Sequence, residues 1–307
     1  MEEFSVHILG CGSANPMQKH RPASQVLSTR GKLFMVDCGE GTQTRLARQG
    51  LGIGRLGHIF LSHEHGDHCF GLPGLVNTMG LLGRTAQLHI HAPQSLEPFV
   101  SFVTSHLCHE AGYEIVFHSL DPREYTLIYE DRRLEAWSLP LRHGVPCCGY
   151  LFREKLGARH IRREMIDAFG IPVCHINGIK EGADWTLPDG TVIPNKRLTT
   201  DPTPPRSWAY VSDTSFEPRL SEWLEGVDLL FHEATFSAQD ELRAKQTCHS
   251  TSTQAATIAK RAGVRKLCIG HYSSRLKDEQ ELLREAQEVF PNTVLADEGL
   301  RLSIGED

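Results

Sequence analysis

The stretch HIFLSHEHGDHCFGLPG, residues 58–74, constrains this chain more than any other. Four potential metal ligands lie within six residues, directly after an apolar run: His63, His65, Asp67 and His68. Burying several ionisable groups together is unfavourable unless another group compensates them. The two residues that open the cluster lie two apart at the end of an expected strand, so their side chains leave on the same face. Gly66 then allows a sharp turn, from which the last two residues can reach a second position.

This spacing predicts a pair of metal ions. Imidazole and carboxylate groups suit Zn²⁺, and Mn²⁺ or Fe²⁺ less specifically. Four local ligands exceed what one tetrahedral ion takes while it keeps an open position, whereas two ions about 3.5–4 Å apart would use them all. A loop of solvated histidines is the alternative, and the buried-type strand before the cluster argues against it.

Three further residues could close such a site from distant parts of the chain. Each follows an apolar β run and stands at a turn: His143 in PLRHGV, Asp213 in AYVSDTS and His271 in LCIGHYSS. Taken alone, each is an ordinary polar strand end. Together with the cluster, they give the number of ligands that two ions need.

Strand and helix patterns alternate in two stretches of the chain, which predicts an α/β fold in two halves. Between them, an excursion at about 153–206 contains the basic, helix-like ARHIRREMIDAFG and ends in the proline-rich LTTDPTPPR. The net charge of −6 argues against sequence-independent nucleic-acid binding by the whole surface, but not against a local basic cleft. The nine cysteines have no framework spacing, and no signal peptide or membrane span is recognisable. We therefore expect reduced thiols, a cytoplasmic location and no membrane association.

The motifs resemble a known family. H-x-H-x-D-H followed by FGLPGL, and then a lone His, an Asp and a His in this order, resembles the metallo-β-lactamase superfamily. Within it, DCGEGTQ, HEAT, CHSTS and GHYSSR resemble the short form of ribonuclease Z, a zinc-dependent endoribonuclease that removes the 3′ trailer from precursor tRNA and leaves a 3′-hydroxyl. The resemblance implies one domain over 1–307, an αβ/βα four-layer sandwich of two mixed β-sheets flanked by helices. It also implies two Zn²⁺ per chain, which Mn²⁺ or Fe²⁺ could replace.

The resemblance also implies roles for the candidate ligands. The first metal would be bound by His63, His65 and His143, the second by Asp67, His68 and His271, and Asp213 would bridge them. Asp67 is also placed to accept a proton from the attacking water. Glu233 in FHEAT and His249 in TCHSTS are candidates for the proton donor to the leaving oxygen, since a histidine beside a carboxylate is suited to that step. Capping of the following helix is the alternative for His249.

Substrate-binding candidates come from two further places. Lys19 and Arg21 lie in PMQKHRP, residues 16–22, where the family pattern has asparagine instead of Pro22, and Ser273 and Arg275 lie in GHYSSR. The excursion matches the region of the family's tRNA-clamping arm, although it lacks the arm's glycine-proline pair. We expect a homodimer in which this arm serves the partner's site, with Arg159, Arg162 and Arg163 as cations for the tRNA; a solvated helix face is the alternative for them.

Three other functions compete with this interpretation, and three further residues could imitate or support the site. The runner-up is a metallo-phosphodiesterase acting on small or cyclic phosphodiesters. Thioester or lactone hydrolysis lacks support from HEAT and CHSTS, and a non-enzymatic RNA-binding protein would require a broken ligand set. His89 and His91 alternate on one strand and are expected to be structural. Asp37 could either orient the active-site turn or cap a glycine turn.

Overall fold

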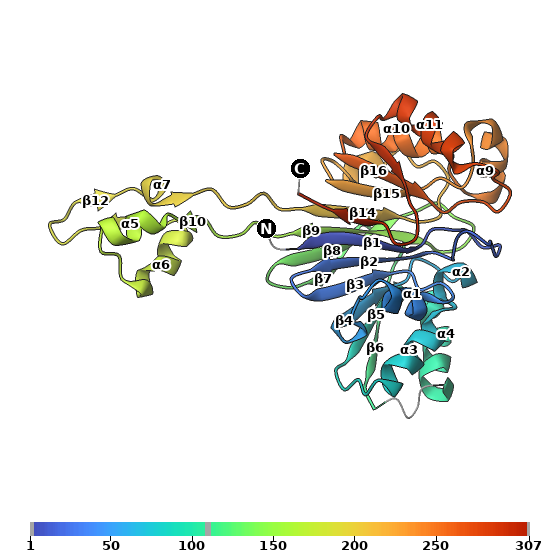
Figure 1. The fold of residues 1–307 in the computed structure, drawn as a ribbon, viewed down its shortest axis with the longest axis horizontal. Coiled ribbons are helices and arrows are strands. Elements are labelled where there is room, and N and C mark those ends of the chain that lie inside the picture. Colours follow the sequence, from blue (N-terminus) through green and yellow to red (C-terminus); the bar gives the residue numbers. More distant parts are fainter. Residues whose placement is uncertain (1–2, 108–111, 306–307) are drawn as a thin grey trace. The chain divides into compact units, whose positions relative to one another are not determined.

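Two seven-stranded mixed sheets form the framework of the computed structural model, which describes residues 3–107 and 112–305 (Figure 1). In spatial order, the first sheet contains β18 (Arg301–Ser303), β1 (Phe4–Gly10), β2 (Ser24–Thr29), β3 (Lys32–Val36), β4 (Leu56–Phe60), β5 (Leu88–Pro93) and β6 (Ile115–Leu120). Its first four strands pair antiparallel, and β3 to β6 pair parallel. The residues that follow β3, β4 and β5 therefore meet at one edge of the sheet.

The second sheet contains β17 (Thr293–Leu295), β16 (Lys266–Gly270), β15 (Leu229–Glu233), β14 (Ser207–Val211), β9 (Cys148–Glu154), β8 (Leu134–Pro140) and β7 (Thr126–Glu130). Strands β14 to β17 pair parallel, so their carboxyl ends also share an edge. Aromatic side chains fill the space between the sheets. The ring of Phe60 lies 5.3 Å from that of Tyr150 and 5.1 Å from that of Phe152. Strands buried on both faces explain the nearly continuous apolar runs in the sequence.

Helices cover the outer face of each sheet. Next to the first are α1 (Thr42–Arg48), η1 (Ile53–Arg55), α2 (Gly66–Cys69), α3 (Leu72–Leu81), η2 (Gln94–Leu96), α4 (Glu97–Phe102) and η3 (Val103–Leu107). With the second are α8 (Leu220–Trp223), η4 (Ala238–Asp240), α9 (Glu241–Thr247), α10 (Ser252–Ala262) and α11 (Glu279–Val289). The layers therefore run helix, sheet, sheet, helix, which confirms the predicted four-layer fold.

Local sequence explains where the elements begin and end. Thr251 and Gln254 form a capping box at the start of α10, and Gly263, with a φ of 62°, ends that helix. The sequence LEPFVSFVTSHLCHEAG, residues 96–112, predicts one helix. The structure has η2, α4 and η3 in this region, and residues 108–111 lie outside the described part. Within that part, no helix combines the length and the apolar character that crossing a bilayer would require.

Residues 130–135 and 153–205 form a second compact unit, which corresponds to the excursion in the sequence. It contains α5 (Arg163–Ala168), α6 (Val173–Lys180), α7 (Asn195–Leu198) and two short strand pairs, β10 (His160–Ile161) with β13 (Thr199–Thr200) and β11 (Trp185–Thr186) with β12 (Val192–Ile193). Its small core consists of Ile171, Ile179, Ile193 and Leu198 with their neighbours. The helix is shorter than ARHIRREMIDAFG suggests, because residues 160–161 pair as a strand with residues 199–200.

Candidate metal centre

The predicted ligands come from loops that the two sheets bring to one place. His63 and His65 follow β4, and Asp67 and His68 lie on α2. Gly66 begins that helix, and a Cβ there would lie 2.4 Å from the ring of Phe70, so any larger residue would have to displace that ring. The second sheet contributes three residues. His143 lies in the loop between β8 and β9, Asp213 in the loop after β14, and His271 directly after β16. Parallel strands place the last two at a common edge.

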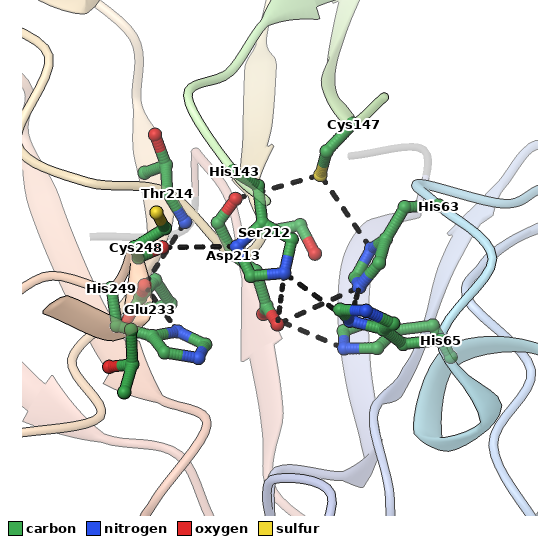
Figure 2. Close-up of polar contacts among 12 residues, drawn as sticks. His63, His65, His143, Cys147, Ser212, Asp213, Thr214, Glu233, Cys248 and His249 are labelled. Carbon is green, nitrogen blue, oxygen red and sulfur yellow. Dashed lines mark hydrogen bonds and ion pairs between the residues drawn. The ribbon is translucent and has the colours of Figure 1, made fainter. Parts of the chain in front are cut away.

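One group of ligand atoms contains three imidazoles and one carboxylate oxygen (Figure 2). His65 Nδ1 lies 3.0 Å from His63 Nε2 and 3.3 Å from His143 Nε2. Asp213 Oδ2 lies 3.7 Å from the first of these Nε2 atoms and 3.8 Å from the second. These are the residues that the resemblance assigns to the first metal.

A second group lies on the other side of the same carboxylate. Asp67 Oδ2 lies 3.3 Å from His68 Nε2 and 3.4 Å from His271 Nε2. Asp213 Oδ1 lies 3.5 Å and 3.2 Å from the same two nitrogens. Each oxygen of Asp213 therefore faces one group, which is the arrangement that a bridging ligand requires.

The spacing of these atoms fits divalent ions better than direct hydrogen bonds. Charge-assisted hydrogen bonds are about 2.7–2.9 Å long, whereas ligands at about 2.0–2.2 Å from a tetrahedral ion lie about 3.3–3.6 Å apart. Most of the separations here fall near the second range. Within the described residues, the buried atoms His68 Nε2 and Asp213 Oδ1 also have no hydrogen-bond partner. An ion in each group would satisfy them, so the donor set fits two ions.

Outer hydrogen bonds orient the ligating rings. His68 Nδ1 donates to the buried carboxylate of Asp37 at 2.7 Å. Of the two roles that the sequence leaves open for Asp37, this contact supports the orienting one. Thr235 Oγ1 accepts from His271 Nδ1 at 2.9 Å, and the carbonyl of Cys248 accepts from His143 Nδ1 at 3.0 Å. With Nδ1 protonated and bound, each Nε2 is left to ligate.

Unusual backbone conformations gather at this centre. The described part contains four non-glycine residues with positive φ. Three of them lie at the candidate metal centre: Asp37 (57°), Cys248 (57°) and His271 (65°). The left-handed region costs an ordinary residue roughly 1 kcal/mol or more, so the surrounding structure must enforce it. Each of the three is a candidate ligand or accepts a hydrogen bond from one. The strain is therefore concentrated where ligand positions are set.

Glu233 and His249 form a pair beside the two groups. His249 Nδ1 lies 3.0 Å from Glu233 Oε1, and this buried carboxylate also accepts backbone N–H groups from Thr214, Thr235 and Ser250. Burial opposes the charged imidazole, but Glu233 outweighs it and raises the pKa of His249 to about 9. The ring is therefore protonated near neutral pH and can donate a proton.

Burial and neighbouring charges shift the ligands in opposite directions. Burial lowers the pKa of His63, and the adjacent His68 lowers it further. Burial also opposes the charged form of His68, but Asp67, Asp213 and Asp37 raise its pKa above the usual range. Burial opposes ionisation of Asp67, and His68 and His271 nevertheless hold its pKa below the usual range. Without ions, the site is a set of strongly coupled charges.

The substrate-binding candidates lie outside both groups. Lys19 forms an ion pair with Glu279, and Ser273 accepts a hydrogen bond from the backbone N–H of Arg275. Arg21 lines a pocket beside Asp67. Their roles toward a substrate remain predictions.

Sequence reasoning missed the cluster of His20, Glu279 and Glu298, whereas it placed His89 and His91 on one strand, where the structure has them. His20 lies between Glu279 and Glu298, which are far away in the sequence, so no local spacing could have revealed the contact. His89 and His91 stack with neighbouring histidines on the first sheet, away from the metal ligands.

Comparison with known proteins gives relatives over the full length. Ribonuclease Z of Bacteroides fragilis (strain YCH46) is 54% identical over 304 residues, covering 99% of this chain and 100% of that protein. Ribonuclease Z of Porphyromonas gingivalis (strain ATCC BAA-308 / W83) is 51% identical with the same coverage. The family described as anti-Pycsar protein Apyc1 matches residues 4–99 only.

Solved structures agree. The short form of human tRNase Z has a TM-score of 0.70 and 25% identity, and the match covers 98% of this chain and 99% of that one. The metallo-β-lactamase fold protein YhfI from Bacillus subtilis has a TM-score of 0.69 and 19% identity, with coverage of 99% and 100%. The second likeness shows the fold alone.

Proposed function

Because the chain belongs to the ribonuclease Z family of the metallo-β-lactamase fold, we propose how its own residues carry out that family's reaction, the endonucleolytic removal of the 3′ trailer from precursor tRNA. One observation carries the proposal. Seven candidate ligands form two groups that share Asp213, directly beside the hydrogen-bonded His249–Glu233 pair. Phosphodiester hydrolysis needs this combination of charge neutralisation, an activated water and a proton donor.

We propose two zinc ions per chain. The residues His63, His65 and His143 would bind one ion, Asp67, His68 and His271 the other, and Asp213 would bridge them. Three imidazoles in one group favour zinc, although Mn²⁺ or Fe²⁺ could take the same donors. When bound, such ions lower the pKa of water toward neutrality and neutralise charge on the phosphate.

The chain's own groups would move two protons. Asp67 belongs to one group and lines the adjoining pocket, and it would accept the proton of the attacking water. As the new P–O bond forms, the bond from phosphorus to the 3′ oxygen of the tRNA breaks. His249 would give its proton to that oxygen, and Glu233 would orient the ring and stabilise its charged form. The products are a tRNA with a 3′-hydroxyl and a trailer with a 5′-phosphate.

The direct test uses a precursor tRNA with a 3′ trailer and the purified protein. We expect a single cut after the tRNA body, a 3′-hydroxyl on the upstream product, and loss of activity after chelation with recovery on adding zinc. Elemental analysis should give two ions per chain. Cleavage of bis-nitrophenyl phosphate without any cleavage of the precursor would instead favour the alternative, a phosphodiesterase for small esters.

The second compact unit is our candidate for the tRNA-clamping arm, acting within a homodimer in the cytoplasm. Arg159 is bound to Asp201 at 2.7 Å, whereas Arg162 and Arg163 are exposed and could meet phosphates. The eight cysteines in the described part are all free thiols, which fits a reducing compartment.

Deleting residues 155–200 should raise KM for precursor tRNA and leave hydrolysis of a chromogenic phosphodiester unchanged. Equal losses on both substrates would contradict the clamp. Light scattering of the intact chain should give the mass of a dimer.

A further inference from the structure

A pocket of about 670 Å³ adjoins the metal centre on the side of His65 and Asp67. One wall is the segment around Arg21, and another is α1, which contributes Arg45 and Arg48. This volume is ample for one nucleotide. Because Asp67 belongs to both the pocket and the candidate centre, a group bound in the pocket would be continuous with the reacting phosphate.

Three arginines and two acidic residues line this pocket, so its charge is positive overall. Among the described residues, none of Arg21, Arg45 and Arg48 takes part in an ion pair. Glu40 and Asp67 are the acidic residues of its lining, and Asp67 is a proposed metal ligand. Arginine guanidinium groups bind phosphate oxygens in two-pronged contacts. The lining therefore suits a phosphate that lies beyond the scissile one.

The wall that carries Arg21 is held rigidly. The His20 ring lies 2.9 Å from Glu279 Oε1 and 2.9 Å from Glu298 Oε2, and the backbone N–H of Arg21 donates to Glu298 Oε1 at 2.6 Å. Glu279 also pairs with Lys19. Lys19 is thus used within the protein, and Arg21 is the cation of this segment that remains for a ligand.

An exposed aromatic ring completes the pocket. Phe70 is 65% exposed, and its ring packs over Gly66, where a Cβ would contact the ring. A large apolar ring left open beside a charged site is a platform for a nucleobase, and such stacking is tolerant of sequence. A trailer of variable sequence would need this kind of contact.

The direction of the RNA follows from the position of the proton donor. Figure 2 shows His249 and Glu233 on one side of Asp213, and His63 and His65 on the other. The leaving 3′ oxygen belongs to the last nucleotide of the tRNA, so that nucleotide lies on the side of His249. The nucleotide after the cut then lies on the side of His65, where the pocket opens.

Building on the proposed function, we propose that this pocket binds the first nucleotide of the trailer. Its base stacks on Phe70, and the phosphate on its 3′ side is bound by Arg45 and Arg48, opposite Arg21. The pocket thereby recognises an RNA strand that continues past the cut. It also retains the 5′-phosphorylated product until release.

The test compares precursors that differ only in trailer length. A one-nucleotide trailer ending in a 3′-hydroxyl has no phosphate for Arg45 and Arg48, whereas a five-nucleotide trailer has one. We expect the double variant R45A/R48A to lose about tenfold in kcat/KM on the longer trailer and to match the wild type on the shorter one. R55A/R284A removes two exposed arginines that do not line the pocket, and it should behave as the wild type on both.

Direct binding supplies a second measurement. A 5′-phosphorylated dinucleotide should inhibit the wild type competitively, and R45A/R48A and F70L should each weaken that inhibition about tenfold with an unchanged Tm. Equal losses on both trailers, or equal losses in R55A/R284A, would overturn the pocket while leaving the proposed function intact. A wild type that cuts neither precursor would overturn the proposed function itself.

Discussion

Replacing Asp37 by asparagine tests whether a residue that touches no substrate tunes the metal centre. Asp37 is fully buried and accepts four hydrogen bonds. The backbone N–H of Ser62 binds Oδ1 at 2.8 Å. His68 Nδ1, the Tyr210 hydroxyl and the Ser62 hydroxyl bind Oδ2 at 2.7, 2.7 and 3.0 Å. The carboxylate thus joins a loop of the first sheet, a proposed ligand and a strand of the second sheet.

The side-chain amide introduced by Asp37→Asn can take two orientations, and these set the limits of the expected loss in the free energy of unfolding. With its oxygen in place of Oδ2, three contacts persist and one buried donor, the N–H of Ser62, faces an NH₂ group. Leaving one buried donor unpaired costs about 1–3 kcal/mol. The opposite orientation would leave three donors unpaired, so the first should prevail. The neutral amide also accepts more weakly from His68, and loss of such a partner typically weakens metal affinity about 10–100-fold.

We therefore expect Asp37→Asn to unfold about 1–3 kcal/mol more easily in metal-free urea titrations. In competition with a chromophoric chelator, one of its two ions should bind about 10–100-fold more weakly. Tyr210→Phe is the matched control. It removes one donor and strands no other, so stability should fall by about 1 kcal/mol and both affinities should persist. If Asp37→Asn bound both ions as tightly as the wild type, Asp37 would be structural only, and equal weakening in Tyr210→Phe would refute the role of charge.

Four shorter predictions concern Asp67, His249 and His20. Asp67→Ala should lose turnover by orders of magnitude on precursor tRNA yet keep a cooperative thermal transition, and an active variant would refute its assignment. His249→Ala should keep both ions by elemental analysis and lose about 10²–10⁴-fold in kcat on RNA, but much less on a nitrophenyl ester whose leaving group needs no proton. Because only protonated His249 donates and its pKa is about 9, wild-type kcat on RNA should fall as pH rises through about 9. In His20, burial opposes the charged ring, but Glu298 and Glu279 raise its pKa above the ordinary 6.5, and the pKa values of both glutamates lie below their ordinary 4.5. The loss of stability that His20→Gln causes in urea unfolding should therefore be largest between pH 4.5 and 6.5. It should disappear as pH rises through the raised pKa of His20 or falls through the lowered pKa values of the two glutamates. A pH-independent difference would show that the ring is neutral.

The spacing of residues was sufficient to predict the candidate ligands, because most of them follow the carboxyl ends of strands. His63 to His68 form one continuous motif, and Asp213 and His271 each follow a recognisable apolar strand. Parallel strands place such residues at one edge whatever the details of packing. The resemblance supplied the four-layer arrangement of two mixed sheets and the pairing of the candidate ligands into two groups. In the structure, the distances between the ligand atoms show two such groups.

Contacts between segments far apart in the sequence could not be predicted from the spacing of residues. His20 meets Glu279 and Glu298 across more than 250 residues, and the same contacts occupy Lys19, which the sequence offered as a phosphate ligand. The helix at 158–170 was overestimated for the same reason. A strand pair with residues 199–200 competes for its first residues, and only the folded unit shows that partner.

Each proposed ion would be held from both sheets, and this bears on stability as well as chemistry. One ion would be bound by His63 and His65 from the first sheet and His143 from the second. The other would be bound by Asp67 and His68 from the first and His271 from the second, with Asp213 shared. The apolar core already positions these strands, so the ions compensate repulsion among buried ligands rather than create the fold. An ion present at 100 times its Kd stabilises the native state by about 2.7 kcal/mol, a substantial part of the roughly 5–15 kcal/mol typical of a folded domain. Chelation should accordingly lower Tm by several degrees and leave a cooperatively folded protein, unlike a small zinc finger, which unfolds without metal. Complete unfolding on chelation would mean that the ions, and not the aromatic layer between the sheets, hold the two halves together.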